Sequence, residues 1–581
     1  MAALYNTPLS ISFLLLFPLI LLLCTQYFFV RRKHAAINLP PTPGISIPLI
    51  GHLHLLRSIP HISLCRLSRK HGPLIRLNLG QFITIVASSR ETAAEILKTQ
   101  DTHFYSRPFP SKVQSFRSIR EQEVEAMVNA ISIQSASLVN LSDVFTCLFN
   151  NIMFREVFGK RPTAAGGDGE YSGTMRSRYH ELIAEVIFLM GVFFLGDLFP
   201  SLGWVDVIRG WKGKLDRSFR ALDAVLEEEI AEGLKRRERQ LEAMPSEEED
   251  DFCFLDVLLR HLTNDDQNEN NGPVGLQLNR VEAKSLLMFR FQKVGTKSIW
   301  NSSRDGAPCL LRSGYYRDWS FGQCSVPMAT FNGRQDLAGI KILRAALFGG
   351  GHQWVDDIIW RASPASKRDS PASVHYHSYI DIFIGGTDTA ASVLEWAMAN
   401  LMRNPEVMRR AQEEVRQVVE HKGSVKEGDL HELHYLKMVI KETLRLHPPG
   451  PLLVHRECMK ETTIEGYRIP VKARILVNAW AIGRDPKYWD DPESFKPERF
   501  EGSAINYLGN HLQFIPFGAG RRICPGMGLG IIGVELALAN FIYNFNWEMP
   551  AGMRRENVSL EEDFGLISHR KEPLLLVPII A

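Results

Sequence analysis

Cys524 lies in a glycine-rich loop that begins at Phe517 and ends at Gly526, directly before a long apolar segment. A helix beginning near Pro525 would direct its first backbone N–H groups at the sulfur, which lowers the pKa of a thiol and stabilises the metal-binding thiolate. Glycines such as Gly520 let the backbone approach a flat partner closely. An isolated Cys-Pro-Gly would indicate an ordinary buried cysteine, but the full spacing F-x-x-G-x-R-x-C-x-G favours a metal ligand.

Glu442 and Arg445 lie three residues apart in the segment LKMVIKETLRLHP, which has helical periodicity. This spacing places both side chains on one face of a helix, where they can form an ion pair. On the surface such a pair would stabilise the helix by about 0.2–0.5 kcal/mol. The pair alone is therefore also typical of an exposed helix, and its meaning depends on what surrounds it.

Asp388 and Thr389 end the sequence Gly-Gly-Thr-Asp-Thr and form a third group with chemical potential. Small residues such as Gly385 and Gly386 let a helix bend open, and a threonine hydroxyl can bond a preceding carbonyl and hold a water there. A carboxylate beside that hydroxyl can relay protons. Without the other motifs this sequence would indicate only a helix kink.

The three motifs resemble those of the cytochrome P450 superfamily, whose members bind haem iron through a cysteine thiolate. The resemblance implies a mainly α fold with small β-sheets and haem (heme, iron protoporphyrin IX) as the cofactor. Cys524 would be the axial ligand of the iron, and Arg522 and Arg456 would bind the haem propionates. The implied cofactor-binding residues are Phe517, Gly520, Arg522, Cys524, Gly526 and Arg456.

The resemblance also implies roles for the other two motifs. Asp388 and Thr389 would be the catalytic residues that deliver the protons needed to split bound O2. Glu442 and Arg445 would form a structural network with Arg499 of the sequence Pro-Glu-Arg-Phe. A buried network of this kind is costly unless every charge is paired, so its expected role is to fix the geometry behind the haem.

Within this superfamily the chain resembles the A-type enzymes of plants. The resemblance includes the proline-rich residues 40–44, residues 51–54 and the sequence of residues 478–500. It implies a monooxygenase of the endoplasmic reticulum membrane that inserts one atom of O2 into a small apolar terpenoid, phenylpropanoid, flavonoid or alkaloid. Electrons would come from NADPH through NADPH–cytochrome P450 reductase. The resemblance covers about residues 1–110, 112–288 and 380–581.

Three departures from the family pattern bear on activity. Ala390 stands where a hydroxyl residue is usual, and the W-x-x-x-R helix that clamps the haem propionates is missing near residue 110. Residues 289–380 interrupt what would be one helix, and they read like translated non-coding sequence. A catalytically impaired splice or gene-model variant is therefore one alternative, and a genuine regulatory insertion is another. A haem-thiolate isomerase or dehydratase is a third alternative, which the Asp388–Thr389 pair disfavours.

An N-terminal anchor is expected to hold these elements at a membrane. Residues 11–30 carry no charge and are long enough, at helical rise, to span the roughly 30 Å hydrocarbon core. A cleaved signal peptide is disfavoured because no basic segment precedes the run and no small-residue cleavage site follows it. The basic residues 31–33 place the remainder in the cytosol. We expect a transmembrane signal anchor at residues 1–30 and a haem-thiolate catalytic domain at residues 31–581.

The composition agrees with a large globular enzyme in a reducing compartment. Of the 581 residues 45% are hydrophobic and the net charge is +2, which excludes a disordered chain and gives no support for nucleic-acid binding. The 8 cysteines are scattered singly, as is usual for reduced thiols. Hydrophobic periodicity predicts a β-hairpin at residues 76–87, a long helix at 215–240, helices between 380 and 447, and a last helix from about residue 525.

Overall fold

The computed structural model describes two main parts of the chain, before residue 254 and after residue 384. The described residues are 38–47, 50–57, 59–80, 82–100, 116–162, 178–191, 199, 203–242, 253, 385–420, 422–563 and 565–581. Four predicted features lie outside them, namely the membrane span at 11–30, the basic residues 31–33, the gap near residue 110 and the insertion at 289–380.

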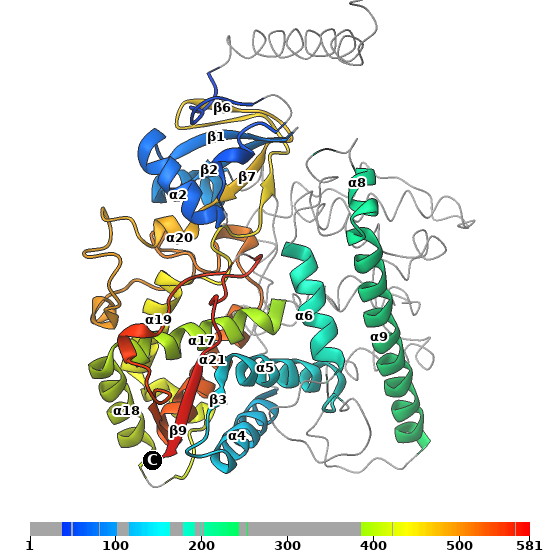
Figure 1. Ribbon diagram of the computed structural model, residues 1–581, viewed down its shortest axis with the longest axis vertical. Helices are drawn as coiled ribbons and strands as arrows, with labels where there is room; N and C mark the ends of the chain where they lie inside the picture. The colour runs from blue at the N-terminus through cyan, green and yellow to red at the C-terminus, as the bar shows by residue number, and fades with distance from the viewer. Residues whose placement is uncertain are drawn as a thin grey trace, which may run out of the picture.

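Helices dominate the described chain, and small sheets lie at two of its edges (Figure 1). The α-helices are α2 (Pro60–His71), α3 (Arg90–Ala94), α4 (Arg117–Ile133), α5 (Leu141–Phe158), α6 (Arg178–Gly191), α8 (Gly203–Ile208), α9 (Trp211–Glu242), α17 (Asp388–Arg403), α18 (Pro405–Val419), α19 (His434–Leu446), α20 (Ala479–Ile482) and α21 (Met527–Asn544). The strands are β1 (Leu74–Leu79), β2 (Phe82–Ala87), β3 (Val139–Asn140), β4 (Arg456–Glu457), β5 (Thr462–Ile464), β6 (Tyr467–Ile469), β7 (Arg474–Val477), β8 (Phe545–Glu548) and β9 (Leu575–Ile580). The predicted mainly α fold with small β-sheets is confirmed.

The predicted hairpin at residues 76–87 is confirmed as β1 and β2, which pair antiparallel around Gly80. Gly80 has a φ of +60°, which glycine adopts without strain. The β-branched strand β2 also pairs in parallel with β7, and β7 pairs antiparallel with β4. The resulting strand order is β1-β2-β7-β4, beside two smaller sheets of order β3-β9-β8 and β5-β6. This sheet places Arg456, on β4, opposite Ile475 of β7.

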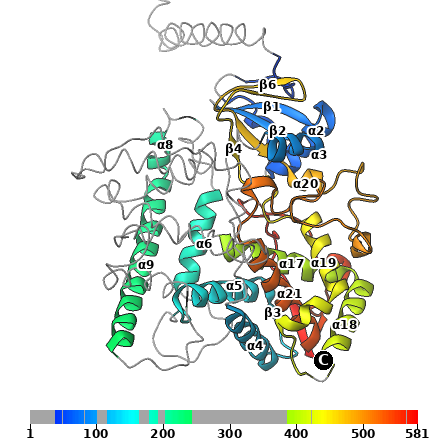
Figure 2. The same cartoon turned by 180° about the vertical axis from the view of Figure 1, so that it is seen from behind.

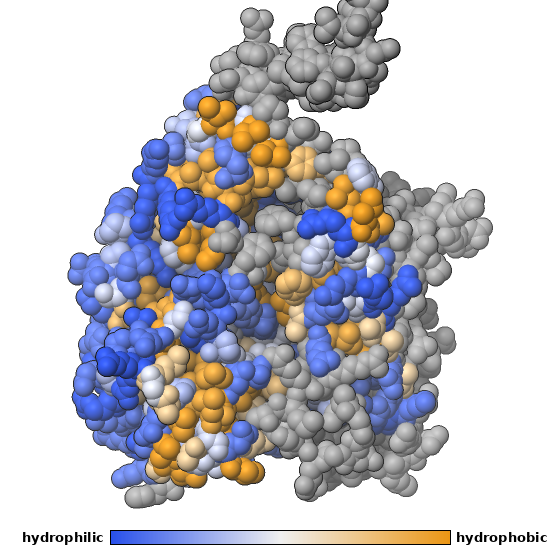
Figure 3. Space-filling model, in the orientation of Figure 1, coloured by the Kyte–Doolittle hydropathy of each residue, from blue (hydrophilic) through white to orange (hydrophobic). Residues whose placement is uncertain are grey.

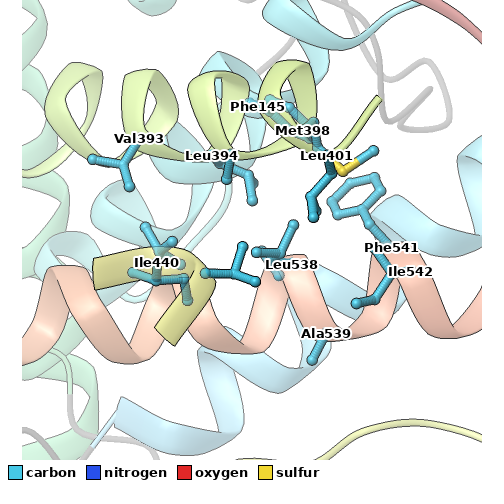
Figure 4. Close-up of a cluster of buried hydrophobic side chains, with 14 of the residues drawn as sticks. Phe145, Val393, Leu394, Met398, Leu401, Ile440, Leu538, Ala539, Phe541 and Ile542 are labelled. Carbon is cyan, nitrogen blue, oxygen red and sulfur yellow. The ribbon is translucent and has the colours of Figure 1, made fainter. Parts of the chain in front are cut away.

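The hydrophobic core lies between α5, α17, α19 and α21, which pack together in both views of the chain (Figure 1 and Figure 2). Leu394 of α17 and Leu538 of α21 are fully buried and point into the space between these helices (Figure 4). Phe145 of α5 meets Phe541 of α21 edge to face, with ring centroids 5.1 Å apart. Burying one such side chain contributes roughly 1.5–3 kcal/mol. The cluster therefore holds α17 and α21 rigidly against each other.

Helix α21 is mostly apolar because it runs through this core. Of the described helices, it is the one long and apolar enough to cross a membrane, and 67% of it is buried inside the protein. Its burial identifies it as a core helix. It lies far from residues 11–30 in the sequence, so it does not bear on the predicted N-terminal anchor.

Apolar residues form several patches on the surface seen in Figure 3. One of these patches lies at the end of the molecule where the four-stranded sheet lies. Ile45, Ile47 and Ile50 are exposed in the N-terminal segment, which bridges to β1 through Gly51 and Leu79. This segment follows the predicted anchor along the chain.

Candidate active site

The loop that carries Cys524 is shaped by glycines in a conformation that other residues rarely adopt. Gly518 and Gly520 have φ angles of +76° and +69°. They turn the chain into a short 3-10 helix, η9 (Gly520–Arg522), just before the cysteine. The Cys524 N–H donates to the carbonyl of Phe517 at 2.9 Å and closes the loop. The sulfur is thereby fixed immediately before α21.

Two backbone donors point at the Cys524 sulfur, as the sequence predicts. The N–H groups of Gly526 and Met527, at the start of α21, hydrogen-bond to Sγ and act to lower the pKa of the thiol. Burial has the larger effect and raises this pKa overall. The predicted lowering is therefore wrong for the protein alone, because desolvation of the thiolate outweighs the two donors. A metal cation would reverse this balance, since coordination deprotonates a thiol.

Positive charge gathers beside this loop. Arg456 is buried on β4, with 6% of its surface exposed. The neighbouring His455 has its pKa lowered to about 4, first by burial and then by the charges of Arg474 and Arg522. These two guanidinium groups therefore lie close enough to His455 to disfavour its protonation. A cofactor that carries carboxylates, as haem does, would be attracted to this cluster.

The start of α21 leaves room for a flat group. A Cβ built on Gly526 or on Gly530 would meet no heavy atom within 4 Å. Within the described part of the chain, no three His, Cys, Asp and Glu side chains form a metal site of their own. The site therefore offers one thiolate, glycine backbone without side chains and nearby guanidinium groups. These features together fit haem, in which the macrocycle supplies most ligands of the iron.

Glu442, Arg445 and Arg499 form one buried network. Arg445 donates from Nε and Nη2 to the two carboxylate oxygens of Glu442, each at 2.8 Å. Nε of Arg499 donates to Oε1 of Glu442 at 2.9 Å. Nη1 of Arg445 donates to the carbonyls of Gly483 and Pro492, both at 2.7 Å. The side chains of Glu442 and Arg445 are 0% exposed and that of Arg499 is 11% exposed, so the charges are paired where water screens them little.

Aromatic rings connect this network to the Cys524 loop. The guanidinium of Arg445 lies 5.3 Å from the ring centroid of Trp489. Trp489 meets Phe514 edge to face, with centroids 6.3 Å apart. Phe514 and Ile523 are both buried in the main core cluster. The network therefore supports the segment that leads to the cysteine.

The chain bends just before α17, where the sequence places the Gly-Gly-Thr-Asp-Thr motif. The hydroxyl of Thr389 donates to the carbonyl of Gly385 at 2.8 Å. A turn at Thr387 interrupts the helix. A Cβ on Gly386 would lie 2.7 Å from Sδ of Met153, so a larger residue would displace that side chain. Small residues are required where the helix passes α5.

The motif and the cysteine lie toward the same end of the core. In Figure 4, α17 runs from Val393 to Leu401 in the same direction as α21 runs from Leu538 to Ile542. The motif is in the first turns of α17, and Cys524 directly precedes α21. Helix packing therefore brings a carboxylate and a hydroxyl to the side of the core where the thiol lies.

Sequence reasoning missed His569, which contacts the motif. Its Nε2 lies 2.8 Å from Oδ2 of Asp388. His569 belongs to the loop before β9, and no motif or periodicity in the sequence marks it. The one available signal was its residue type, because histidine titrates near neutral pH.

Comparisons with known proteins show which sequences this chain resembles. A family model for cytochrome P450 matches residues 40–117 and 375–577. Cytochrome P450 71A1 of Persea americana is 36% identical over 566 residues, which cover 91% of this chain and 91% of that protein. Premnaspirodiene oxygenase of Hyoscyamus muticus is 32% identical, over 95% of this chain and 96% of its own. Tabersonine 6,7-epoxidase isoform 1 of Catharanthus roseus is 33% identical, over 94% and 92%.

Proposed function

Because the chain belongs to the cytochrome P450 family and is an oxidoreductase, we propose that it inserts one atom of O2 into a small apolar plant secondary metabolite. The observation that carries the proposal is the Cys524 loop. It offers one sulfur with two backbone donors, beside guanidinium groups and an open helix start. This combination suits haem, which takes a single thiolate ligand from the protein.

The roles of the residues follow from their positions. Haem, when bound, supplies the iron at which O2 is activated. Cys524 would hold the iron through its thiolate, and Arg522 and Arg456 would attract the propionates. Asp388 would hold and release a proton at its carboxylate. The Thr389 hydroxyl, which donates to the carbonyl of Gly385, would hold a water at the bend before α17.

The substrate class and the electron source are part of the same proposal. Two of the similar proteins are named as an oxygenase of premnaspirodiene and an epoxidase of tabersonine, which favours a terpenoid or alkaloid over a large polar substrate. Electrons would come from NADPH through NADPH–cytochrome P450 reductase. Residues 1–30 would anchor the protein in the endoplasmic reticulum membrane, with residues 31–581 as the cytosolic catalytic domain.

The test is the reduced carbon monoxide difference spectrum of the full chain expressed in microsomes. We expect a Soret band at the position typical of thiolate ligation, and we expect Cys524→Ala to abolish it. Cys458→Ala is the matched control, because Cys458 is also a free cysteine and lies outside the Cys524 loop. No such band in the wild type, or a band that survives Cys524→Ala, would refute the proposal.

A second candidate is a catalytically impaired variant of the same enzyme. The family model matches residues 40–117 and 375–577 and leaves the stretch between them unmatched, which contains the predicted insertion at 289–380. Transcript sequencing across that insertion and across residue 110 distinguishes the two. A full-length transcript without the insertion, together with a carbon monoxide band only from its product, would establish the impaired variant.

A further inference from the structure

The C-terminal loop, which precedes β9 and contains Ser568 and His569, packs along one face of α17. The carbonyl of Ser568 accepts hydrogen bonds from the Ser392 hydroxyl at 2.7 Å and from Nε1 of Trp396 at 2.9 Å. The next residue of the loop, His569, lies 2.8 Å from Asp388. Because Asp388, Ser392 and Trp396 are spaced by four residues, they share one side of α17. The loop therefore sets where the Asp388 side chain lies.

Carboxylates surround the His569 ring. Asp388 and Glu395 face it from α17, and Asp563 faces it from its own loop. Two cations lie beside these carboxylates: Nη1 of Arg570 is 3.6 Å from Oε1 of Glu395, and Lys571 interacts electrostatically with Asp563. Burial lowers the pKa of His569, but Asp388 and then the other two carboxylates raise it above its ordinary value overall. The imidazolium form is therefore more favoured in His569 than in a free histidine.

His569 and Asp388 differ in how much of each side chain is exposed to solvent. The side chain of His569 is 35% exposed, whereas that of Asp388 is 16% exposed. A proton from solvent consequently reaches the imidazole more readily than it reaches the carboxylate. The hydrogen bond between them is short enough for direct proton transfer.

We propose that His569 is the positioning residue of Asp388 and reloads its carboxylate with protons from solvent. The proton on Nε2 moves along the hydrogen bond to Oδ2 of Asp388 after Asp388 has given up its own proton. The imidazole, now neutral, takes the next proton from water, and no electron moves. This inference rests on the proposed function, in which Asp388 delivers protons.

A double-mutant cycle on thermal stability tests the pair without any turnover. The thermal midpoint of the full chain is measured between pH 5 and 9 (about the range in which histidine changes charge) for the wild type, His569→Gln, Asp388→Asn and the double variant. The pKa of His569 is raised in the folded state, so its stabilisation is present at low pH and lost as pH rises through that pKa. We expect His569→Gln to lower the midpoint at low pH, less at high pH, and little in the Asp388→Asn background. The proposal would be overturned if the difference in thermal midpoint between the wild type and His569→Gln did not depend on pH. It would also be overturned if His569→Gln lowered the midpoint equally in the Asp388→Asn background.

Turnover separates a proton relay from a merely structural contact. With haem, reductase and NADPH, we measure the fraction of NADPH electrons released as hydrogen peroxide and its dependence on pH. We expect His569→Gln to raise this fraction several-fold, with a larger solvent deuterium isotope effect. The matched control is His71→Gln, at a half-buried histidine that ends α2, which should behave as the wild type.

The two proposals fail in different ways. If the wild type lacks the carbon monoxide band, the proposed function is wrong and the relay with it, while the stability cycle still decides whether the pair exists. If the band is present and His569→Gln leaves both the peroxide fraction and its pH profile unchanged, the relay alone is wrong.

Discussion

Replacing Glu442 by glutamine is the most informative perturbation of the scaffold. The carboxylate accepts two hydrogen bonds from Arg445, one from Arg499 and one from the backbone N–H of Lys496. Glutamine has nearly the same shape but no charge, and its amide NH2 would face donors. Two guanidinium groups would then be left in a site where Glu442 itself is 0% exposed.

The expected loss of stability in Glu442→Gln follows from that geometry. Removing one partner of a buried ion pair destabilises a protein by about 3–5 kcal/mol. Glu413→Gln is the matched control, because Glu413 pairs with Arg409 on the surface of α18, where both side chains are 60% exposed. Exposed pairs of this kind often contribute nothing measurable.

Urea unfolding followed by tryptophan fluorescence measures the difference. Trp489 lies against Arg445 and should report directly on the network. We expect a large fall in the unfolding midpoint for Glu442→Gln and none for Glu413→Gln. Equal midpoints for the two variants would refute the view that the buried network stabilises the segment leading to Cys524.

Three further outcomes are expected. Gly520→Ala forces a side chain into a φ of +69° and should lower the stability by about 1–2 kcal/mol and lower the haem content. Gly450→Ala, at a position with open space and no positive φ, should change neither. Urea unfolding midpoints and haem content measure the two effects. Thr389→Ala removes the hydroxyl at the bend, so the peroxide fraction of NADPH oxidation should rise; an unchanged fraction would exclude a role in proton delivery. His447 has a pKa lowered to about 4 by burial, so the folded state binds fewer protons than the unfolded state and stability should fall as pH decreases from about 6.5 to 4. His447→Phe, which keeps the stack on Trp396, should make thermal midpoints fall less steeply over that range.

Features that depend on nearby residues were predictable from the sequence. The β1–β2 hairpin follows from alternation around Gly80, and the Glu442–Arg445 pair follows from helical spacing. The two N–H groups aimed at Cys524 follow from its place before a helix. Each of these involves residues within a few positions of one another, so local geometry suffices.

Features that depend on distant contacts were not predictable. The contact of His569 with Asp388 joins two segments that share no periodicity, and only the packing of the C-terminal loop on α17 creates it. The pKa of Cys524 depends on how much of the protein covers the sulfur, and the residues around it in the sequence do not carry that information. The parallel pairing of β2 with β7 is of the same kind.

That parallel pairing has a consequence for synthesis of the chain on the ribosome. Strand β2 is complete early, but its partner β7 is made about 390 residues later, a delay of about 20 to 80 seconds at ordinary translation rates. Throughout that time one side of the new hairpin presents unpaired backbone groups, which attract other strands. Premature termination anywhere in between would release a product with an open, aggregation-prone edge.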